Sequence, residues 1–217
     1  MNIKDYKDKE MNMYILGILF LYIYISDSFS INNDKIMYIN QLITTTLASG
    51  VIFLFTYLSD AIVSSYLKDK IVYLFGIINK PGEIIFSSIR EKSKDDRIST
   101  DKAIRIYKDI YEHMPQDKNE RKKYENANWY VIYCKYREEK MIQISNREYL
   151  MTRDFVFVTI ALFLIYTALS ILKLTVWNYK FAIVLLLLTI INIISANIKA
   201  KRFTYNVIAI DLAKTSK

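Results

Sequence analysis

Two unbroken apolar runs of about 18 residues constrain this chain more than any other feature. The first covers Phe155–Leu172 and the second covers Phe181–Ile198. An α-helix rises about 1.5 Å per residue, so roughly 20 apolar residues are needed to cross the hydrocarbon core of a bilayer. Runs of this length are typical of membrane spans and exceed the usual core helix of a soluble domain. We therefore predict two transmembrane helices in this half of the chain.

Two more apolar stretches lie in the N-terminal third. They cover Met11–Ile25, and Tyr38–Leu58 with a helical continuation to Leu67. The first is short for a span, and a cleaved signal peptide is the alternative interpretation. No small-x-small cleavage site follows it, which disfavours that alternative. The predicted fold class is thus an all-α integral membrane protein with four transmembrane helices in a two-plus-two arrangement.

The basic residues predict the orientation of these spans. Of the 30 Lys and Arg residues, only Lys35, Lys173 and Lys180 fall in the two short loops, which leaves 30 − 3 = 27 on the opposite side. Loops rich in Lys and Arg stay in the cytoplasm, and Trp and Tyr favour the interfaces, as Trp177 does in the second short loop. Both termini and the long central segment are therefore expected in the cytoplasm, most simply at a bacterial cytoplasmic membrane.

Four regions follow from this topology. They are an N-terminal tail with spans 1 and 2 (1–67), a basic helical cytoplasmic insert (68–154), spans 3 and 4 (155–198), and an amphipathic cytoplasmic tail (199–217). The net charge of +8 favours anionic headgroups as a partner. Within the insert, however, the basic residues exceed the acidic ones by only 19 − 15 = 4. This near balance predicts no nucleic-acid surface, which would be more one-sided.

The sequence of the insert contains the start and stop signals of several short helices. An interfacial helix over Tyr66–Ile78 is expected to end before Pro81, which can start another helix. Ser99 or Thr100 caps the next helix, which Pro115 ends. The sequence therefore predicts several short helices in this part of the insert.

Two later boundaries of the insert are less uniquely specified. The acidic first turn at Asp117 opens a helix to about Lys140, although a hairpin over 129–144 is an alternative because that run is rich in β-branched and aromatic residues. Ser145 and Glu148 have capping-box spacing. They predict a helix from about Asn146 that runs directly into the third span, and the tail beyond the fourth span is expected to pack on the insert.

Polar residues within the spans are the first group of candidate functional residues. In membranes such side chains most often join helices through hydrogen bonds, and the alternative is the polar lining of a pore made by several copies. The group comprises Thr45, Ser49, Asp60, Asn192, Ser195 and Asn197.

Charged residues of the insert and tail are the second group, as candidate contacts to the membrane surface or to a protein partner. Asp211 is also expected to pair with an arginine of the insert, such as Arg153. The group comprises Arg121, Lys122, Lys123, Arg147, Arg153, Asp154, Lys201, Arg202 and Asp211.

The inventory of reactive side chains predicts neither a metal site nor catalysis. The chain has one cysteine, Cys134, and one histidine, His113, and neither lies in a catalytic or metal-binding motif. The glycines are too far apart for a phosphate-binding loop. We therefore expect no cofactor and no enzymatic activity, with a thiol enzyme and a lipid-metabolising enzyme as minor alternatives.

In layout the chain resembles small four-span membrane proteins of prokaryotic antiviral defence systems. The resemblance is one of topology, with Arg153-Asp154 at the head of the third span and Arg202-Phe203 and Asn206 to Asp211 after the fourth as its nearest approach to a motif. It implies an effector that perturbs the inner membrane, or a sensor that passes a signal to a cytosolic partner.

Together these features predict a non-enzymatic, homo-oligomeric inner-membrane protein. Its insert would receive a partner or signal, and its spans would respond as the effector or sensor of an anti-phage system. A stand-alone ion channel or transporter is one alternative, but charges are nearly absent from the apolar stretches. A membrane anchor for a soluble protein is the other.

Overall fold

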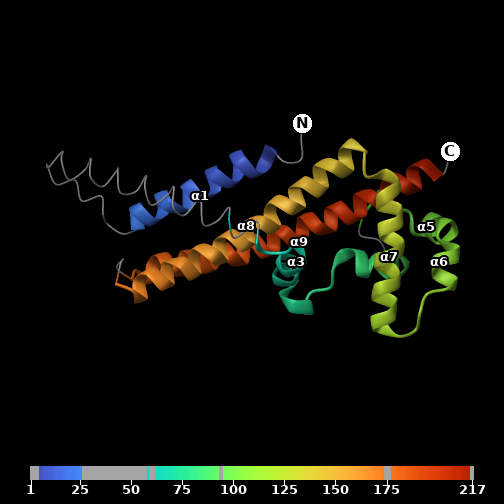
Figure 1. Cartoon of the computed structure of the whole chain (residues 1–217). Coiled ribbons are helices and arrows are strands. Elements are labelled where there is room, and N and C mark those ends of the chain that lie inside the picture. Colours follow the sequence, from blue (N-terminus) through green and yellow to red (C-terminus); the bar gives the residue numbers. More distant parts are fainter. Residues whose placement is uncertain (1–4, 26–57, 59–61, 93–94, 174–176, 216–217) are drawn as a thin grey trace. The chain divides into compact units, whose positions relative to one another are not determined.

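All described secondary structure is helical in the computed structural model of the chain (Figure 1), which describes residues 5–25, 58, 62–92, 95–173 and 177–215. The chain divides into two compact units. Unit 1 comprises residues 1–72 and 151–195, and unit 2 comprises residues 73–150 and 196–217. The helices are α1 (Asp5–Ile25), α3 (Ser65–Val72), η1 (Leu74–Gly76), η2 (Pro81–Glu83), α4 (Ile85–Lys92), α5 (Thr100–Ile106), α6 (Lys108–Glu112), α7 (Lys118–Tyr136), α8 (Lys140–Ile171) and α9 (Tyr179–Thr215).

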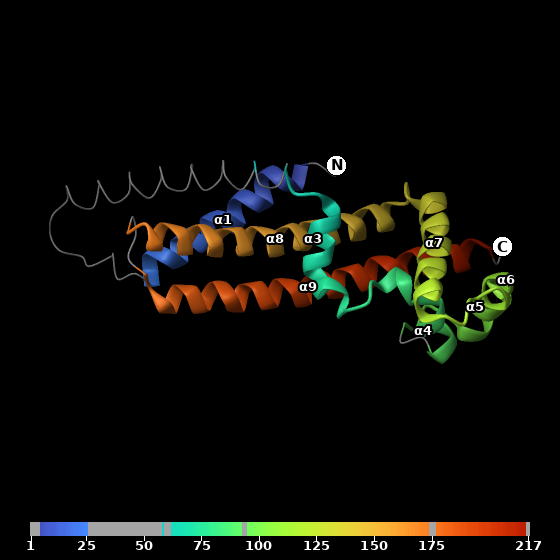
Figure 2. The same ribbon diagram turned by 60° about the horizontal axis from the view of Figure 1, so that its bottom comes forward.

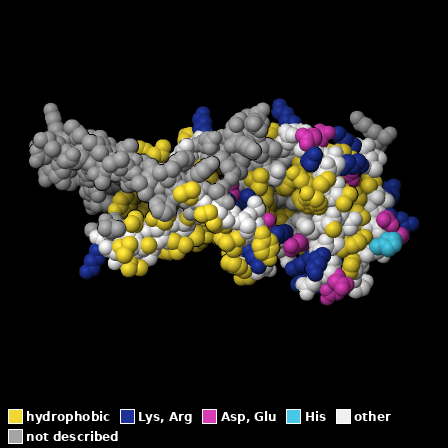
Figure 3. Space-filling model, in the orientation of Figure 1, with side chains coloured by type: hydrophobic (Ala, Val, Ile, Leu, Met, Phe, Trp, Pro, Cys, Tyr) yellow, Lys and Arg dark blue, Asp and Glu magenta, His cyan; other side chains and the backbone are white. Residues whose placement is uncertain are grey.

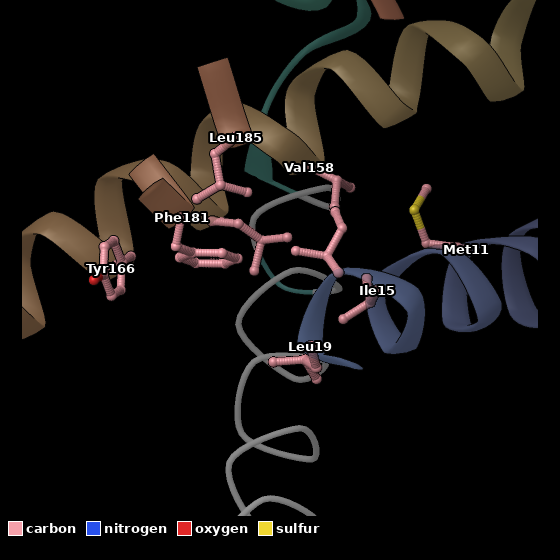
Figure 4. Packing of buried hydrophobic residues seen from close by; sticks show 9 residues of the cluster. Met11, Ile15, Leu19, Val158, Tyr166, Phe181 and Leu185 are labelled. Carbon is pink, nitrogen blue, oxygen red and sulfur yellow. The ribbon is translucent and has the colours of Figure 1, made fainter. Parts of the chain in front are cut away.

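The core of unit 1 is made by α1 and the apolar parts of α8 and α9. Buried side chains recur along α1 at Met11, Ile15, Ile18 and Leu19, which is the three- and four-residue spacing of one helical face. Figure 4 shows this face directed at side chains from α8 and α9, among them Tyr166, Phe181 and Leu185. Tyr166 and Phe181 meet edge to face with their ring centroids 5.1 Å apart.

Among the described residues, α8 and α9 are the helices long and apolar enough to cross a membrane. In the best 18-residue window, 33 % of the residues of α8 and 28 % of those of α9 are buried, and the other residues are half-buried or exposed in a single copy. The outward face of α9 is continuous and lies 50–61 % exposed at each of its large apolar positions: Ile183, Leu186, Leu187, Ile190, Ile191, Ile194 and Ile198.

The described residues thus contain two candidate membrane spans and do not support the predicted four. The first predicted span is helical, but the apolar part of α1, Met11–Ile25, covers only about 15 residues, or roughly 22 Å. The second predicted span, Tyr38–Leu58, lies almost wholly outside the described residues. Its expected continuation to Leu67 is interrupted, because Val63 and Ser64 are not helical and α3 begins anew at Ser65.

Unit 2 is a small helical domain built around the C-terminal part of α9. Tyr205, Ile208 and Leu212 of α9 are buried against side chains of α4 and α5, such as Phe86 and Ala103. In both Figure 1 and Figure 2, α7 crosses this part of α9. A second cluster joins Tyr136 and Ile142 to Phe203 and Val207. The packing of the tail on the insert agrees with the sequence prediction.

Capping side chains fix the shorter helices of unit 2. Ser99 accepts a hydrogen bond from the backbone N–H of Lys102, and the Asp117 carboxylate accepts bonds from the N–H groups of Asn119 and Glu120. Both residues satisfy donors that a helix start leaves unpaired. The predicted starts at these two positions are confirmed, and Pro81 starts η2 as expected.

Of the two alternatives for residues 129–144, the structure has the helix and not the hairpin: α7 continues to Tyr136, and α8 begins at Lys140. The predicted capping box at Ser145 and Glu148 is wrong. The Ser145 hydroxyl donates to the carbonyl of Met141, 2.9 Å away, as serine does inside a helix. Burial of Ile142 in the second cluster favours the longer helix over the cap.

Candidate functional site

A hydrogen-bonded triad of polar side chains lies inside the apolar core of unit 1. The Asn192 amide Nδ2 donates to Tyr14 Oη at 2.6 Å and to Thr159 Oγ1 at 3.0 Å, and the Tyr14 and Thr159 hydroxyls lie 2.8 Å apart. Thr159 is fully buried, and its hydroxyl is also 2.7 Å from the carbonyl of Phe155. The triad thus joins α1, α8 and α9 by side-chain bonds that an apolar environment strengthens.

The surroundings of the triad show how the sequence places it. Tyr14 stacks on Phe155 with ring centroids 4.2 Å apart, which fixes the phenol over α8. Thr189, one turn before Asn192, instead bonds the carbonyl of Leu185 in its own helix. Of the two polar residues Thr189 and Asn192, only Asn192 therefore bonds another helix. Asn192 was predicted as a candidate from the sequence, whereas Tyr14 and Thr159 were not, because a tyrosine or threonine in an apolar run has no distinguishing pattern.

A buried cluster of charges lies where α3 meets the start of the apolar part of α8, also in unit 1. Asp154 is fully buried, with its carboxylate 3.6 Å from Lys68 Nζ and 3.2 Å from a guanidinium nitrogen of Arg153. Arg153 also pairs with Asp69 at 3.3 Å, and Lys68 Nζ lies 5.3 Å from the ring centroid of Phe157. The two acids and two bases leave the cluster with no net charge, which lowers the cost of burying it.

This burial changes the interpretation of two predicted contact residues. Arg153 and Asp154 were expected to face the membrane surface or a partner, yet they are only 9 % and 0 % exposed. Their charges are used inside the unit to hold α3 against α8. Lys68 is also buried, at 3 % exposed, although lysine is usually an exposed residue.

Asp211 of unit 2 receives a different partner from the one predicted. Its carboxylate accepts a hydrogen bond of 2.7 Å from the Tyr107 hydroxyl and lies 3.5 Å from Lys135 Nζ. The expected pairing with Arg153 is wrong, because Arg153 contacts Asp69 and Asp154 within unit 1. Burial and the nearby carboxylate both raise the pKa of Tyr107, so its hydroxyl stays a donor. Asp211, at 5 % exposed, is a core residue rather than a surface contact.

A second buried acid in unit 2 was not found from the sequence. Glu125 of α7 is 1 % exposed and accepts hydrogen bonds from the Ser87 backbone N–H at 3.0 Å and from the Ser87 hydroxyl. Burial raises the pKa of Glu125, and the bonds from Ser87 oppose that shift. Glu125 lies among many charged residues of α7, so its inward direction has no signal in the sequence. Through the bonds from Ser87, Glu125 joins α7 to α4.

The predicted basic surface residues are dispersed. Arg121 is half-buried and donates to the carbonyl of Gln116 at 3.0 Å, whereas Lys122 is half-buried and Lys123 is exposed. Arg147 is half-buried on α8. On the face seen in Figure 3, basic and acidic side chains are interspersed over the part of the surface that carries α5 to α7. This surface therefore resembles an ordinary solvated one more than a single basic patch.

The remaining basic candidates line two adjoining cavities of unit 2. The larger, of about 540 Å³, is lined by Lys201 and Arg202 together with Asp95, Asp96, Arg97, Ile198 and Tyr205. The smaller, of about 240 Å³, shares Lys201 and Tyr205 and adds Ile78, Asn79, Pro81, Ile84, Ser88 and Asn197. Lys201 Nζ lies 5.5 Å from the Tyr205 ring centroid, and Arg202 lies 3.7 Å from Glu148.

The Arg97 side chain in the larger cavity is bonded to other residues of unit 2. Its guanidinium forms two bonds to the Asp95 carboxylate, at 2.9 and 2.7 Å, and a third to Asn206 Oδ1 at 2.9 Å. The pair lowers the pKa of Asp95 and raises that of Arg97. Among the described residues that line the smaller cavity, Lys201 is the charged one. An anion would therefore find its cationic group at Lys201.

Two other predicted span residues, Ser195 and Asn197, lie within the described part of α9. Ser195 is half-buried on α9, and Asn197 lines the smaller cavity. Thr45, Ser49 and Asp60 lie outside the described residues. Within the described part of the chain, no group of three His, Cys, Asp or Glu side chains is placed to hold a metal ion.

Comparisons with family models, with curated proteins and with solved structures gave no match. The chemistry available in the described residues is therefore the guide to function. It consists of helix-joining polar clusters and a cavity with one cationic group.

Proposed function

We propose that this chain is a non-enzymatic effector of the bacterial cytoplasmic membrane, in which unit 2 is the cytoplasmic receiver of a signal or partner and unit 1 is the responding membrane part. In this proposal α1 and the segment 38–58 are the first and second of four spans, both termini are cytoplasmic, and several copies assemble. The observation that carries the proposal is the continuity of α8 and α9, which each run unbroken from the apolar segment of unit 1 into unit 2.

Continuous helices favour transmission because they are stiff. A partner that displaced the unit 2 end of α9 would act through a helix with Asn192 bonded to α1 and α8. Packed helices respond to such a push by small shifts between discrete arrangements. The triad is thus the point at which a movement of α9 would reach α1.

Self-association is supported by the exposed apolar face of α9. A helix in a bilayer gains little from lipid contact alone, and spans associate through packing and interhelical hydrogen bonds. The Asn192 amide nitrogen and the two hydroxyls of the triad bond one another within one copy. The outward apolar face of α9 is then the surface offered to lipid or to another copy. The link to anti-phage defence comes from the resemblance in layout alone.

The test is the membrane potential of bacteria that express the protein, followed with a voltage-sensitive dye. Expression of the wild type should depolarise the cells. Asn192→Leu should remove the effect while the protein still reaches the membrane fraction, because α9 loses its bonds to α1 and α8. The matched control is Thr189→Val, which removes a hydroxyl bonded only within α9 and should depolarise like the wild type.

An unchanged potential with the wild type in the membrane fraction would contradict the effector proposal and favour an anchor for a soluble partner. The defence context has its own readout. Expression with the neighbouring genes should lower the number of phage plaques, and Asn192→Leu should restore it.

A further inference from the structure

The chain of unit 2 makes an exposed apolar turn at Leu74, Phe75, Gly76 and Ile77, here called the apolar turn. Three of its residues have left-handed backbone angles, with φ of 46° at Leu74, 56° at Phe75 and 99° at Gly76. This region suits glycine and is unfavourable for residues that carry a side chain. Two large apolar residues are therefore held in a conformation that costs free energy.

That conformation does not serve to bury the side chains. Phe75 is 73 % exposed and Ile77 is 83 % exposed. The turn is closed by backbone hydrogen bonds from Gly76 and Ile78 to the carbonyl of Tyr73, at 3.0 and 3.1 Å. Tyr73 itself is buried and donates from its hydroxyl to Tyr149. A rigid base thus presents an apolar tip outward.

The smaller cavity adjoins this turn and has the chemistry of a phosphate site. Ile78 and Asn79, the next residues in the chain, form one wall, and Asn197 and Lys201 of α9 form the other. Its polar groups are the Lys201 ammonium, two amides and the hydroxyls of Ser88 and Tyr205, and the other lining residues are the apolar Ile78, Pro81 and Ile84. Lysine is a common phosphate ligand, and an apolar wall beside it suits an anion attached to a hydrocarbon chain.

The position along α9 fixes what kind of anion is available. Asn197 and Lys201 lie next to the end of the outward apolar face, whose last large residue is Ile198. If α9 crosses the membrane as proposed above, this is the depth of the headgroups of the cytoplasmic leaflet, where lysines meet anionic lipid. The cavity and the apolar turn then face the same layer.

We propose that the smaller cavity binds the phosphate of an anionic phospholipid at Lys201, and that the apolar turn inserts Phe75 and Ile77 into the same leaflet. The two parts act together, because the turn would enter the acyl region beside the bound headgroup. Unit 2 would thereby be held to the inner surface through a lipid contact additional to the spans. This inference rests on the proposed membrane location of α9.

The experiment uses full-length protein in nanodiscs, with Cys134 changed to Ser and a single environment-sensitive fluorophore on a cysteine introduced at Ile77. Quenching by acyl-spin-labelled phosphatidylglycerol is compared with quenching by spin-labelled phosphatidylcholine. Labels at Ile190 of α9 and at Val131 of α7 serve as the membrane and surface references, since these side chains are 54 % and 69 % exposed. The Ile77 label should be quenched, with about a fivefold preference for the anionic lipid, which is the contribution of one lysine near an anionic surface.

Lys201→Gln should remove the preference, and Lys123→Gln, at an exposed lysine of α7, should leave it unchanged. Quenching at Ile190 but not at Ile77 would overturn the lipid contact and leave the membrane location standing. Absence of quenching at both would overturn the membrane location itself. A preference that survives Lys201→Gln, or that added inorganic phosphate abolishes, would overturn the assignment of the cavity to a lipid phosphate.

Discussion

The hydrogen bond between Tyr107 and Asp211 allows the stability of unit 2 to be tested one atom at a time. Tyr107→Phe removes only the hydroxyl that donates to the buried carboxylate at 2.7 Å. A bond to a charged group contributes about 1.5–3 kcal/mol, whereas a bond between neutral groups contributes about 0.5–1.5 kcal/mol. Lys135 is 3.5 Å from the same carboxylate but largely exposed, so it offsets little of the loss. We expect Tyr107→Phe to lower the free energy of unfolding by about 2 kcal/mol.

The matched control is Tyr111→Phe. The Tyr111 hydroxyl donates to the Phe86 carbonyl at 3.1 Å, so the same chemical change removes a bond to a neutral acceptor. It should cost about 1 kcal/mol. Combining Tyr107→Phe with Asp211→Asn completes a double-mutant cycle, in which the coupling between the two residues should be about 1–2 kcal/mol.

The assay is urea unfolding of full-length protein in mild detergent. The chain has two tryptophans, and Trp129 packs in both clusters of unit 2. In a Trp177→Phe background the fluorescence therefore reports this unit alone. Equal losses for Tyr107→Phe and Tyr111→Phe, or a loss from Tyr107→Phe that is the same with Asn at 211, would refute the assignment of a charge-assisted bond.

Two further predictions use the same readout. The pKa of Glu125, ordinarily 4.5, is raised in the folded protein, so the contribution of Glu125 to the free energy of unfolding is fully present below about pH 4.5 and is lost as pH rises through the folded pKa. Glu125→Gln should remove this part of the loss of stability with rising pH. Parallel plots of unfolding free energy against pH for the two proteins, between about pH 4 and 7, would contradict the prediction. Gly82→Ala should cost about 1–3 kcal/mol, because its new Cβ would lie 3.1 Å from the Trp129 ring and 2.8 Å from Asn126 Oδ1. A midpoint equal to that of the parent protein would exclude the steric reasoning.

Local signals were sufficient for much of the fold. The apolar runs predicted α8 and α9, and Ser99 and Asp117 marked helix starts, because a cap requires only a side chain and the backbone two or three residues away. The cap predicted at Ser145 was wrong, because the choice there depended on packing with residues distant in the sequence. A cap and an interior serine have the same local sequence, and the packing of Ile142 decided between them.

The partners of the polar residues could not be predicted. Asn192 was a candidate on its own, but its bond to Tyr14 joins residues at opposite ends of the chain. Charge type was also misleading, since Lys68 and Asp154 are buried together while Lys123 is exposed. A sequence shows which residues can form an ion pair or hydrogen bond, and only the folded chain shows which residue each one meets.

The bond between Tyr14 and Asn192 also has a consequence for biosynthesis. A ribosome completes Tyr14 178 residues before it reaches Asn192. In a membrane, residues 73–150 of unit 2 would all be synthesised before the Tyr14 hydroxyl of α1 could bond the Asn192 amide of α9. Closure of the triad is therefore a late event in cotranslational assembly, and a chain truncated before Asn192 would leave both Tyr14 and Thr159 without that amide, exposing an immature chain to quality-control proteases.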